Sequence, residues 1–425
     1  MKPHKPLIAA AAATLLLAGC SSGGNYTDPT DKLEVLSWWS SASERPAFEV
    51  LTGAFEKANP GVRLINAAVE GGGGSNAQVA LAERLAANNP PDLWQSLTGS
   101  AVDGWASARR IVDIEPVFAR TGIGPALAPA IRDSVMRDGK PWAMPTGAHR
   151  GNNLWFNRDA LAKAGVEVPG AGYTQDRLAG DLDKVAAAGI TPLCLGSADR
   201  FALVELFENT LLGIVGPGGW QRIADDRFDW GGSEVSTALD RFGAYVGHAG
   251  RDADTTHWAD AVAKLSRGEC AFLSMNDSAY GELTATGAVD GQQFGYAPFP
   301  GTEGAYLAIV DTFVAAKKAK NGVNALKFLD TVADPATMLA FTRAKGSVPV
   351  RRDVDTSTLS PYQRGASAAL WHDRVLLSIT HGELMSTAFQ QALYDAVGDF
   401  AKHRDKRAFI NTVQRAGTTG QIGGR

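Results

Sequence analysis

The sequence has few of the residues that bind metals or staple small folds. Its 425 residues include three cysteines and seven histidines, and none of them has the spacing of a zinc motif. A metal site and a disulfide framework are therefore not expected, and no cofactor is predicted. Cys194 and Cys270 lie in apolar, strand-like segments, "TPLCLG" and "GECAFLSM". Two buried free thiols are the favoured interpretation, and a disulfide is the alternative.

Basic clusters and long apolar runs are also scarce. With 41 Lys and Arg against 45 Asp and Glu, the formal charge is −4 and the isoelectric point is about 6.0, which argues against a nucleic-acid partner. One apolar run, "PLIAAAAATLLLAGC", follows Lys2 and Lys5. It is too short to span a bilayer as a stable helix, and no later segment is long and apolar enough to do so.

This run ends in Leu-Ala-Gly-Cys at residues 17–20, which resembles a bacterial lipobox. The resemblance implies that residues 1–19 are a lipoprotein signal peptide and that Cys20 carries the lipid. The small, polar residues 20–31 would then form a flexible tether. We therefore expect an extracytoplasmic protein, anchored to the cell membrane by lipid without spanning it. An ordinary signal peptide that happens to contain a cysteine is the alternative.

Motifs of nucleotide binding and of catalysis are missing. Gly71–Gly74 lies between a predicted strand and a predicted helix, but it lacks the Gly-Lys-Ser/Thr ending of a phosphate loop. A rim loop is predicted instead, with its backbone amides, Ser75 or Asn76 facing a ligand. No Gly-x-Ser-x-Gly elbow is present, and the protein is not expected to be an enzyme. A lipid-anchored carbohydrate hydrolase, using acids such as Glu44 and Asp311, is the alternative from another class.

Strand-like and helical patterns alternate along the chain. "KLEVLSW" predicts a strand, and "PAFEVLTGAFEKANPG" predicts a helix with Phe48, Leu51 and Phe55 on one face. "VRLINAAVE" and "PPDLWQ" predict further strands, and "AQVALAERLAANN" predicts a helix between them. This alternation predicts an α/β fold with a parallel sheet. About 400 residues exceed one typical hydrophobic core, so two lobes are expected.

Several segments share their order and spacing with a known family. They are "SWW" after the first strand, "LAANNPPDLWQ", "DGKPWAMP", "WFNRDALAKAGV", "LSRGECAFLSMND" and "KGSVPVRRD". They resemble the extracellular solute-binding proteins of the maltose-binding-like cluster, which bind sugars for ABC importers. The most similar pattern is that of the subgroup binding glucose, galactose or related aldohexoses. It shares "SWW" with a nearby glutamate, the "KGS" turn and a later "HG" pair.

The resemblance implies a periplasmic-binding-protein-like fold, in which two α/β lobes are joined by three crossing segments around a ligand cleft. The crossings are expected near residues 144–149, 309–312 and 345–349. Short links punctuated by Pro and Gly, "WAMPTG" and "KGSVP", agree with this placement. The predicted lobe 1 is 32–145 plus 311–345, and the predicted lobe 2 is 148–308 plus 349–425.

A sugar offers a ring of hydroxyls and a weakly apolar face, so its site needs aromatic planes together with amide or charged groups. Trp38 and Trp39 end the first strand, and one of them is expected in the core and the other in the cleft. By resemblance, the further ligand-binding candidates are Glu44, Gln95, His149, Asp277, Asp311, Lys345 and His381.

Four of these candidates have alternative interpretations. Lys345 is alternatively a surface lysine at the C-terminus of a helix. Glu44 is alternatively an exposed residue at a helix start, and His149 a hinge histidine bonded to backbone. Asp277 is alternatively a helix cap.

The sequence also departs from the related pattern. Ser278 stands where that pattern often has a sugar-stacking tryptophan, and Leu97 where it has a histidine. Tyr280 or another aromatic would have to compensate. The favoured ligand is a monosaccharide of the aldohexose type, with a disaccharide or oligosaccharide as the alternative. Capture by hinge closure, delivery to an ABC permease and a monomeric state are expected.

Overall fold

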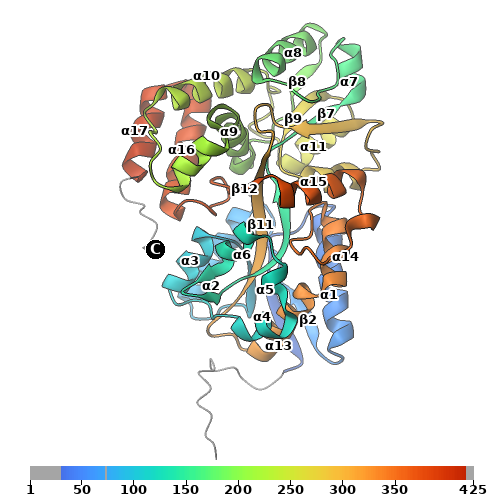
Figure 1. Ribbon diagram of the computed structural model, residues 1–425, viewed down its shortest axis with the longest axis vertical. Coiled ribbons are helices and arrows are strands. Elements are labelled where there is room, and N and C mark those ends of the chain that lie inside the picture. The colour runs from blue at the N-terminus through green and yellow to red at the C-terminus, as the bar shows by residue number, and fades with distance from the viewer. Residues whose placement is uncertain (1–29, 72–73, 418–425) are drawn as a thin grey trace, which may run out of the picture.

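The computed structural model describes residues 30–71 and 74–417, which fold into two α/β lobes (Figure 1). The predicted signal peptide, the predicted lipidation site Cys20 and most of the predicted tether lie outside these ranges, as do Gly72 and Gly73 of the glycine stretch. Within them, no helix has the length and apolar character needed to cross a bilayer.

Lobe 1 is built on a mixed sheet in the order β12-β11-β3-β1-β2, with β6 also paired to β11. As predicted, β1 is parallel to β2 and to β3, whereas β11 is antiparallel to β3 and β6. The strands are β1 (Lys32–Leu36), β2 (Arg63–Asn66), β3 (Leu93–Leu97), β6 (Met144–Arg150), β11 (Ala305–Ala315) and β12 (Arg374–Leu377), with a separate pair β4 (Met136–Arg137) and β5 (Lys140–Pro141).

The first helix shows why these segments fold as they do. Phe48, Leu51 and Phe55 of α1 are all buried, as the periodicity predicts, and the helix ends before Asn59, ahead of Pro60 and Gly61. The helices of lobe 1 are α1 (Glu44–Ala58), α2 (Ser75–Ala86), α3 (Ser100–Ser107), α4 (Glu115–Thr121), α5 (Ile123–Ala126), α6 (Pro129–Val135), α13 (Gly322–Ala333) and α14 (Pro335–Lys345).

Lobe 2 has its own sheet in the order β10-β7-β9-β8. Its strands are β7 (Asn153–Asn157), β8 (Thr191–Leu193), β9 (Cys270–Ser274) and β10 (Phe294–Pro298). Helix α15 (Pro361–His372) follows the short 3-10 helix Thr356–Thr358 and packs against β11. The helices of lobe 2 are α7 (Arg158–Lys163), α8 (Gln175–Ala187), α9 (Arg200–Ala224), α10 (Ser233–Gly247), α11 (Trp258–Ser266), α12 (Ser278–Ala285), α16 (Thr387–His403) and α17 (Lys406–Gly417).

Three segments run side by side where the lobes meet. The strand β11 pairs with β12 through its first residues and with β3 through its last, so it belongs to both lobes (Figure 1). β6 lies along β11, and the amide of Val348 bonds the carbonyl of Ala148 at 3.0 Å. The predicted crossings fall in these segments. The lobe boundaries at single residues stay predictions.

Cys194 and Cys270 form a disulfide, so the favoured interpretation of two free thiols was wrong. Cys270 begins β9, and Cys194 directly follows β8, its parallel neighbour in the sheet. Their Cα atoms are 5.4 Å apart, a separation typical of a disulfide. The pairing depends on the order of strands in the sheet, which cannot be derived from the sequence of either segment.

The double variant Cys194→Ser/Cys270→Ser is expected to lower the free energy of unfolding by about 4 kcal/mol. The disulfide closes a loop with a sequence separation of 76, and that loop restricts the unfolded chain. Urea denaturation of both proteins measures the difference. A reducing agent should destabilise only the parent protein, and equal stability of the two proteins would contradict the prediction.

Candidate functional site

A buried chain of charged groups crosses the junction of the lobes. His149, on β6, contacts two carboxylates: Nδ1 pairs with Asp277 Oδ1, and Nε2 lies 3.2 Å from Asp311 Oδ2. Asp277 precedes α12 in lobe 2, and Asp311 is on the shared strand β11. The other oxygen of Asp277 accepts hydrogen bonds from the Arg150 amide at 3.1 Å and from the Tyr362 hydroxyl at 3.2 Å. Both ring nitrogens of His149 are therefore directed at the two acids.

The ionisation of this cluster follows from its burial. Burial and the charge of Lys345 lower the pKa of His149, but Asp277 and Asp311 outweigh both and raise it to about 9. Burial alone would raise the pKa of Asp311, yet the hydrogen bond from His149 and the charge of Lys345 hold it below its ordinary value. The imidazolium of His149 and the carboxylate of Asp311 are thus both charged at neutral pH.

Lys345 lies at the other end of this chain of charged groups, where it pairs with Glu44. It is 1 % exposed, its Nζ lies 3.2 Å from Glu44 Oε1 and 3.5 Å from Ser278 Oγ, and it sits 5.6 Å from the ring centroid of Trp39. Burial lowers the pKa of Lys345, but Glu44 and Asp311 raise it above its ordinary value. Replacing this lysine by alanine would leave buried acids unpaired, which is strongly destabilising. Lys345 therefore stabilises the fold.

The structure separates the two tryptophans. Trp39 is 1 % exposed and packs against Phe48, Phe313 and Phe341 with ring centroids 5.1 to 6.2 Å away. Of the pair predicted as ligand contacts, Trp39 is therefore the core residue. Trp38, directed to the other face of the chain, is half-buried and lines a cavity.

The alternative interpretations of three candidates do not hold. Glu44 begins α1 but is buried, and its Oε2 accepts hydrogen bonds from the amides of Ser40 and Ser41. His149 is bonded to carboxylates and not to backbone. Asp277 precedes α12 without a side-chain capping bond.

The cavity beside Trp38 lies between the lobes and has a volume of about 340 Å³. Lobe 1 contributes Trp38, Gln78, Gln95 and Trp105, and the segment after β12 contributes His381, Gly382, Thr387 and Gln390. Three predicted site residues, Trp38, Gln95 and His381, are thus brought together in one wall, and Trp105, Gln78 and Gln390 were not predicted. Within the described residues, His381 is the one ionisable side chain of the lining.

Gln95 connects the cavity to the buried charges. Its Nε2 donates to Asp311 Oδ1 at 2.9 Å, and its Oε1 accepts from the Trp38 amide at 3.1 Å. One N–H and one lone pair of this amide remain for another partner. The charge cluster therefore orients both the amide of Gln95 and the backbone that carries Trp38.

The last residue of the glycine stretch, Gly74, lies close to the indole of Trp38. Gly74 has a φ of 99°, which L side chains rarely adopt, and a Cβ placed on it would lie 3.1 Å from the Trp38 ring. The predicted rim-loop role of Asn76 is not supported, because its side chain bonds the Glu70 carbonyl at 2.9 Å. Ser75 begins α2. Tyr280, expected to compensate for Ser278, stacks on Tyr362 at 4.8 Å and is buried outside the cavity lining.

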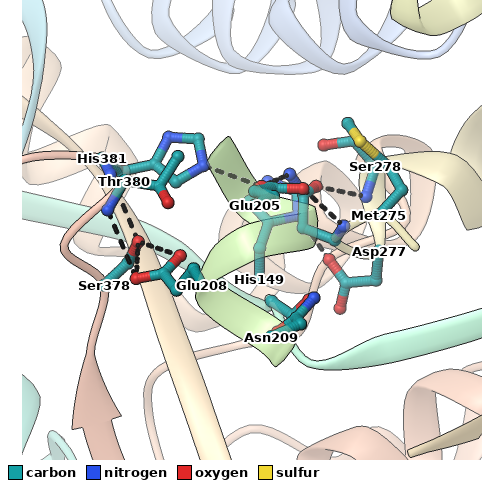
Figure 2. Close-up of polar contacts among 12 residues, drawn as sticks. His149, Glu205, Glu208, Asn209, Met275, Asp277, Ser278, Ser378, Thr380 and His381 are labelled. Atoms are coloured by element: carbon teal, nitrogen blue, oxygen red, sulfur yellow. Dashed lines mark hydrogen bonds and ion pairs between the residues drawn. The ribbon is translucent and has the colours of Figure 1, made fainter. Parts of the chain in front are cut away.

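His381 is held by buried acids of α9 that the sequence interpretation missed (Figure 2). Its Nε2 lies 2.8 Å from Glu205 Oε1, and the second oxygen of Glu205 accepts the Asn276 amide at 3.2 Å. Burial lowers the pKa of His381, but Glu205 outweighs it and raises the pKa. Glu208, one turn further along α9, accepts the amides of Ile379 at 2.6 Å and Thr380 at 3.2 Å. A signal was present, since both acids interrupt the apolar run "FALVELFENTLLGIVG".

Glu383 is a third buried acid near this wall. Its Oε1 accepts the Val310 amide of β11 at 2.7 Å and the Thr98 hydroxyl at 3.0 Å. Its Oε2 has no hydrogen-bond partner among the described residues. Burial raises the pKa of Glu383 to about 7. Within the described ranges, no group of three or more His, Cys, Asp or Glu side chains has the geometry to bind a metal ion.

The lobes also touch directly beside the charge cluster. Glu282 of α12 accepts hydrogen bonds from the amide and the hydroxyl of Ser43, which precedes α1, at 2.9 and 2.7 Å. Gly281 makes the approach possible, because a Cβ there would lie 2.5 Å from the Lys345 carbonyl oxygen. A carboxylate at the start of a helix is favoured by the helix dipole. This contact stabilises the observed arrangement of the lobes.

Two α/β lobes joined by shared strands, with a cavity between them, are the architecture of a two-lobed binding protein. The sequence matches the family of bacterial extracellular solute-binding proteins over residues 39–338. The chain belongs to this family. A relative from Brucella suis, described as a probable sugar-binding periplasmic protein, is 30% identical over 404 residues, which cover 93% of this chain and 94% of the relative.

Solved structures agree on the fold. A bacterial solute receptor described as preferring β-D-galactopyranose has a TM-score of 0.79 and 16% identity, covering 91% of this chain and 98% of that one. A chitin-oligosaccharide-binding protein has a TM-score of 0.79 and 17% identity, covering 92% of this chain and 99% of that one.

The charge on His149 is expected to make stability depend on pH. Because its pKa is raised to about 9, its contribution is fully present below about pH 6.5 and is lost as pH rises to about 9, by roughly 3 kcal/mol. Chemical denaturation between these pH values should show a smaller decline for His149→Gln than for the parent protein. An identical decline in both proteins would contradict the prediction.

Glu383 is expected to act in a different pH window. With its pKa raised to about 7, the protonated form is favoured in the folded state, and stability is lost as pH rises from about 4.5 to 7. Glu383→Gln keeps the acceptor oxygen and removes the charge, so it should flatten this decline and raise the melting temperature at pH 8. An unchanged or lower melting temperature at pH 8 would show that the buried charge is compensated.

Proposed function

We propose that the protein is the sugar-binding component of an ABC importer and that it captures a neutral sugar in the cavity between its lobes. The observation that carries the proposal is the composition of the cavity wall. Among aliphatic residues, it combines two indoles, Trp38 and Trp105, with three side-chain amides, Gln78, Gln95 and Gln390. Membership of the solute-binding family and the description of the Brucella suis relative support the same function.

This wall fits the chemistry of a sugar. An indole face packs against the C–H face of a pyranose, and an amide both donates and accepts, as a hydroxyl requires. An anionic or cationic ligand would need a charged partner, and His381 is already paired with Glu205. The wall therefore favours an uncharged polyol.

The size of the cavity favours a small sugar. Its volume of about 340 Å³ lies at the low end of the usual range of ligand pockets, roughly 300 to 1,000 Å³. We propose a monosaccharide of the glucose or galactose type. The alternative is a disaccharide or larger oligosaccharide, because the solved structures of this fold include one described as binding a monosaccharide and one described as binding chitin oligosaccharides.

The origin of the wall residues supports capture by closure. Trp38 and Gln95 come from lobe 1, whereas His381 and Gln390 come from the segment that follows β12. A ligand that contacts both sets stabilises the closed arrangement and shifts the population toward it. The closed protein is then the form that the permease would receive. We propose that it acts as a monomer and has no catalytic role.

Anchoring completes the proposed function. The lipobox-like residues 17–20 support lipidation of Cys20 and an extracytoplasmic location at the cell membrane. The remaining candidates Glu44, His149, Asp277, Asp311 and Lys345 are buried and paired with one another. We propose that they orient the wall and hold the lobes, and that Asp311 acts on the ligand through Gln95.

Trp38→Ala is expected to weaken sugar binding about tenfold or more, because one stacked ring is lost from the wall. A thermal-shift screen of glucose, galactose, xylose, maltose and melibiose identifies the ligand first. Isothermal titration calorimetry then measures its affinity in both proteins. Trp371→Ala is the matched control, since Trp371 is also half-buried but packs against Arg352 outside the cavity.

Two outcomes would overturn the proposal. Equal affinity in Trp38→Ala and in the Trp371→Ala control would mean that the sugar binds elsewhere. Turnover of aryl-glycosides or oligosaccharides by the purified protein, lost in Asp311→Asn, would favour the lipid-anchored carbohydrate hydrolase.

A further inference from the structure

One end of lobe 1 carries a cluster of exposed cations on an otherwise acidic chain. We call it the basic pole and define it by the exposed residues Lys32, Arg109, Arg110, Lys317 and Lys318. In Figure 1, α4 and α13 mark this end of lobe 1, the end farthest from lobe 2. The chain as a whole has a net charge of −4, so the sign of this cluster is opposite to that of the chain.

Backbone and side-chain contacts bring these residues together from three parts of the chain. The Lys317 amide bonds the Arg110 carbonyl at 2.8 Å, which joins the end of β11 to the segment after α3. Asn324 of α13 donates to the carbonyls of Thr30 and Lys32 at 2.8 and 2.9 Å. The start of β1 is thereby held beside the lysines that precede α13.

The charges of the basic pole are largely uncompensated. Within the described ranges, no acid lies within 4.0 Å of the charged atoms of Arg109, Arg110, Lys317 or Lys318. Lys318 bonds the neutral amide of Asn88 at 2.8 Å. The nearby Glu34 is occupied by Arg84, with two contacts of 2.6 and 2.7 Å. Asp31 is the acid next to Lys32 in sequence. The pole therefore presents a positive potential to its surroundings.

The chain enters the fold at this pole. Thr30 is the first described residue and is bonded to α13 there. Ten residue steps separate Cys20 from Thr30, so a lipidated Cys20 would keep the pole within about 36 Å of the membrane. A positive surface held so close to a membrane meets the negative potential of anionic headgroups.

We propose that the basic pole lies against the anionic phospholipid headgroups of the membrane that carries the protein. The proposal rests on the proposed lipidation of Cys20 and is independent of the identity of the sugar. This contact orients lobe 1 with the pole toward the lipid, and lobe 2 farther from it. Electrostatic attraction of this kind is screened by salt, since the Debye length falls to about 3 Å at 1 M ionic strength.

Lysine footprinting of the lipidated protein tests the contact. The protein, whose lipid on Cys20 is verified by intact mass, is inserted into nanodiscs of phosphatidylcholine with or without one third phosphatidylglycerol. A water-soluble amine-acetylating reagent is added, and labelling is measured lysine by lysine. Labelling of Lys317 and Lys318 should fall about fivefold or more in the anionic nanodiscs and recover at about 1 M salt. Lys163 and Lys402, exposed on lobe 2, should not change.

A pair of matched variants tests the role of charge. Arg109→Glu/Arg110→Glu should abolish the protection of Lys317 and Lys318, whereas Arg251→Glu/Arg407→Glu, which changes the same charge on exposed residues of lobe 2, should keep it.

Three results would overturn the proposal: equal labelling in both lipids, protection that requires the permease, or an unlipidated Cys20. Calorimetric sugar affinity, measured on the same protein, tests the proposed function separately.

Discussion

The charge of His149, held between Asp277 and Asp311, is the interaction on which the rest of the structure depends. Two buried carboxylates would be costly without a cation, and the imidazolium compensates both from one position. Because the three residues come from β6, β11 and the start of α12, their pairing joins both lobes to the shared strand. The same pairing fixes the position of Asp311. Asp311 accepts a hydrogen bond from Gln95 and so orients it, and Gln95 accepts one from the backbone amide of Trp38.

This constraint divides the polar residues of the junction into two groups. The charged side chains of the first group pair with one another, and the second group, at the cavity, consists of indoles, amides and His381 among aliphatic residues. A neutral ligand could then bind without separating a buried ion pair. Separating such a pair would be strongly destabilising. Glu205 contacts His381 from α9 and fixes the position of this imidazole at the cavity wall.

The direct contact of Glu282 with Ser43 and the family fold give the proposed closure a physical basis. Helix α12 of lobe 2 meets the start of α1 in lobe 1 through a carboxylate and two donors, at a point where glycine allows close approach. The shared strand β11 continues through both lobes, so relative motion must be taken up by the ends of β6 and β11 and by the segment around Val348. The basic pole of lobe 1 lies at the end away from this junction (Figure 1), so the proposed membrane contact and the proposed ligand capture use different surfaces.

The sequence by itself determined the α/β class, the parallel start of the first sheet and the buried face of α1, because these depend on local periodicity. It also placed Trp38, Gln95 and His381 among the site candidates. It did not determine which tryptophan is buried, because Trp39 finds its aromatic partners on β11 and α14. Nor did it determine the disulfide, which requires β8 and β9 to be neighbours, or the mutual pairing of five charged candidates from distant segments. Those features follow from contacts between residues far apart in the chain, and such contacts exist only once the tertiary structure has formed.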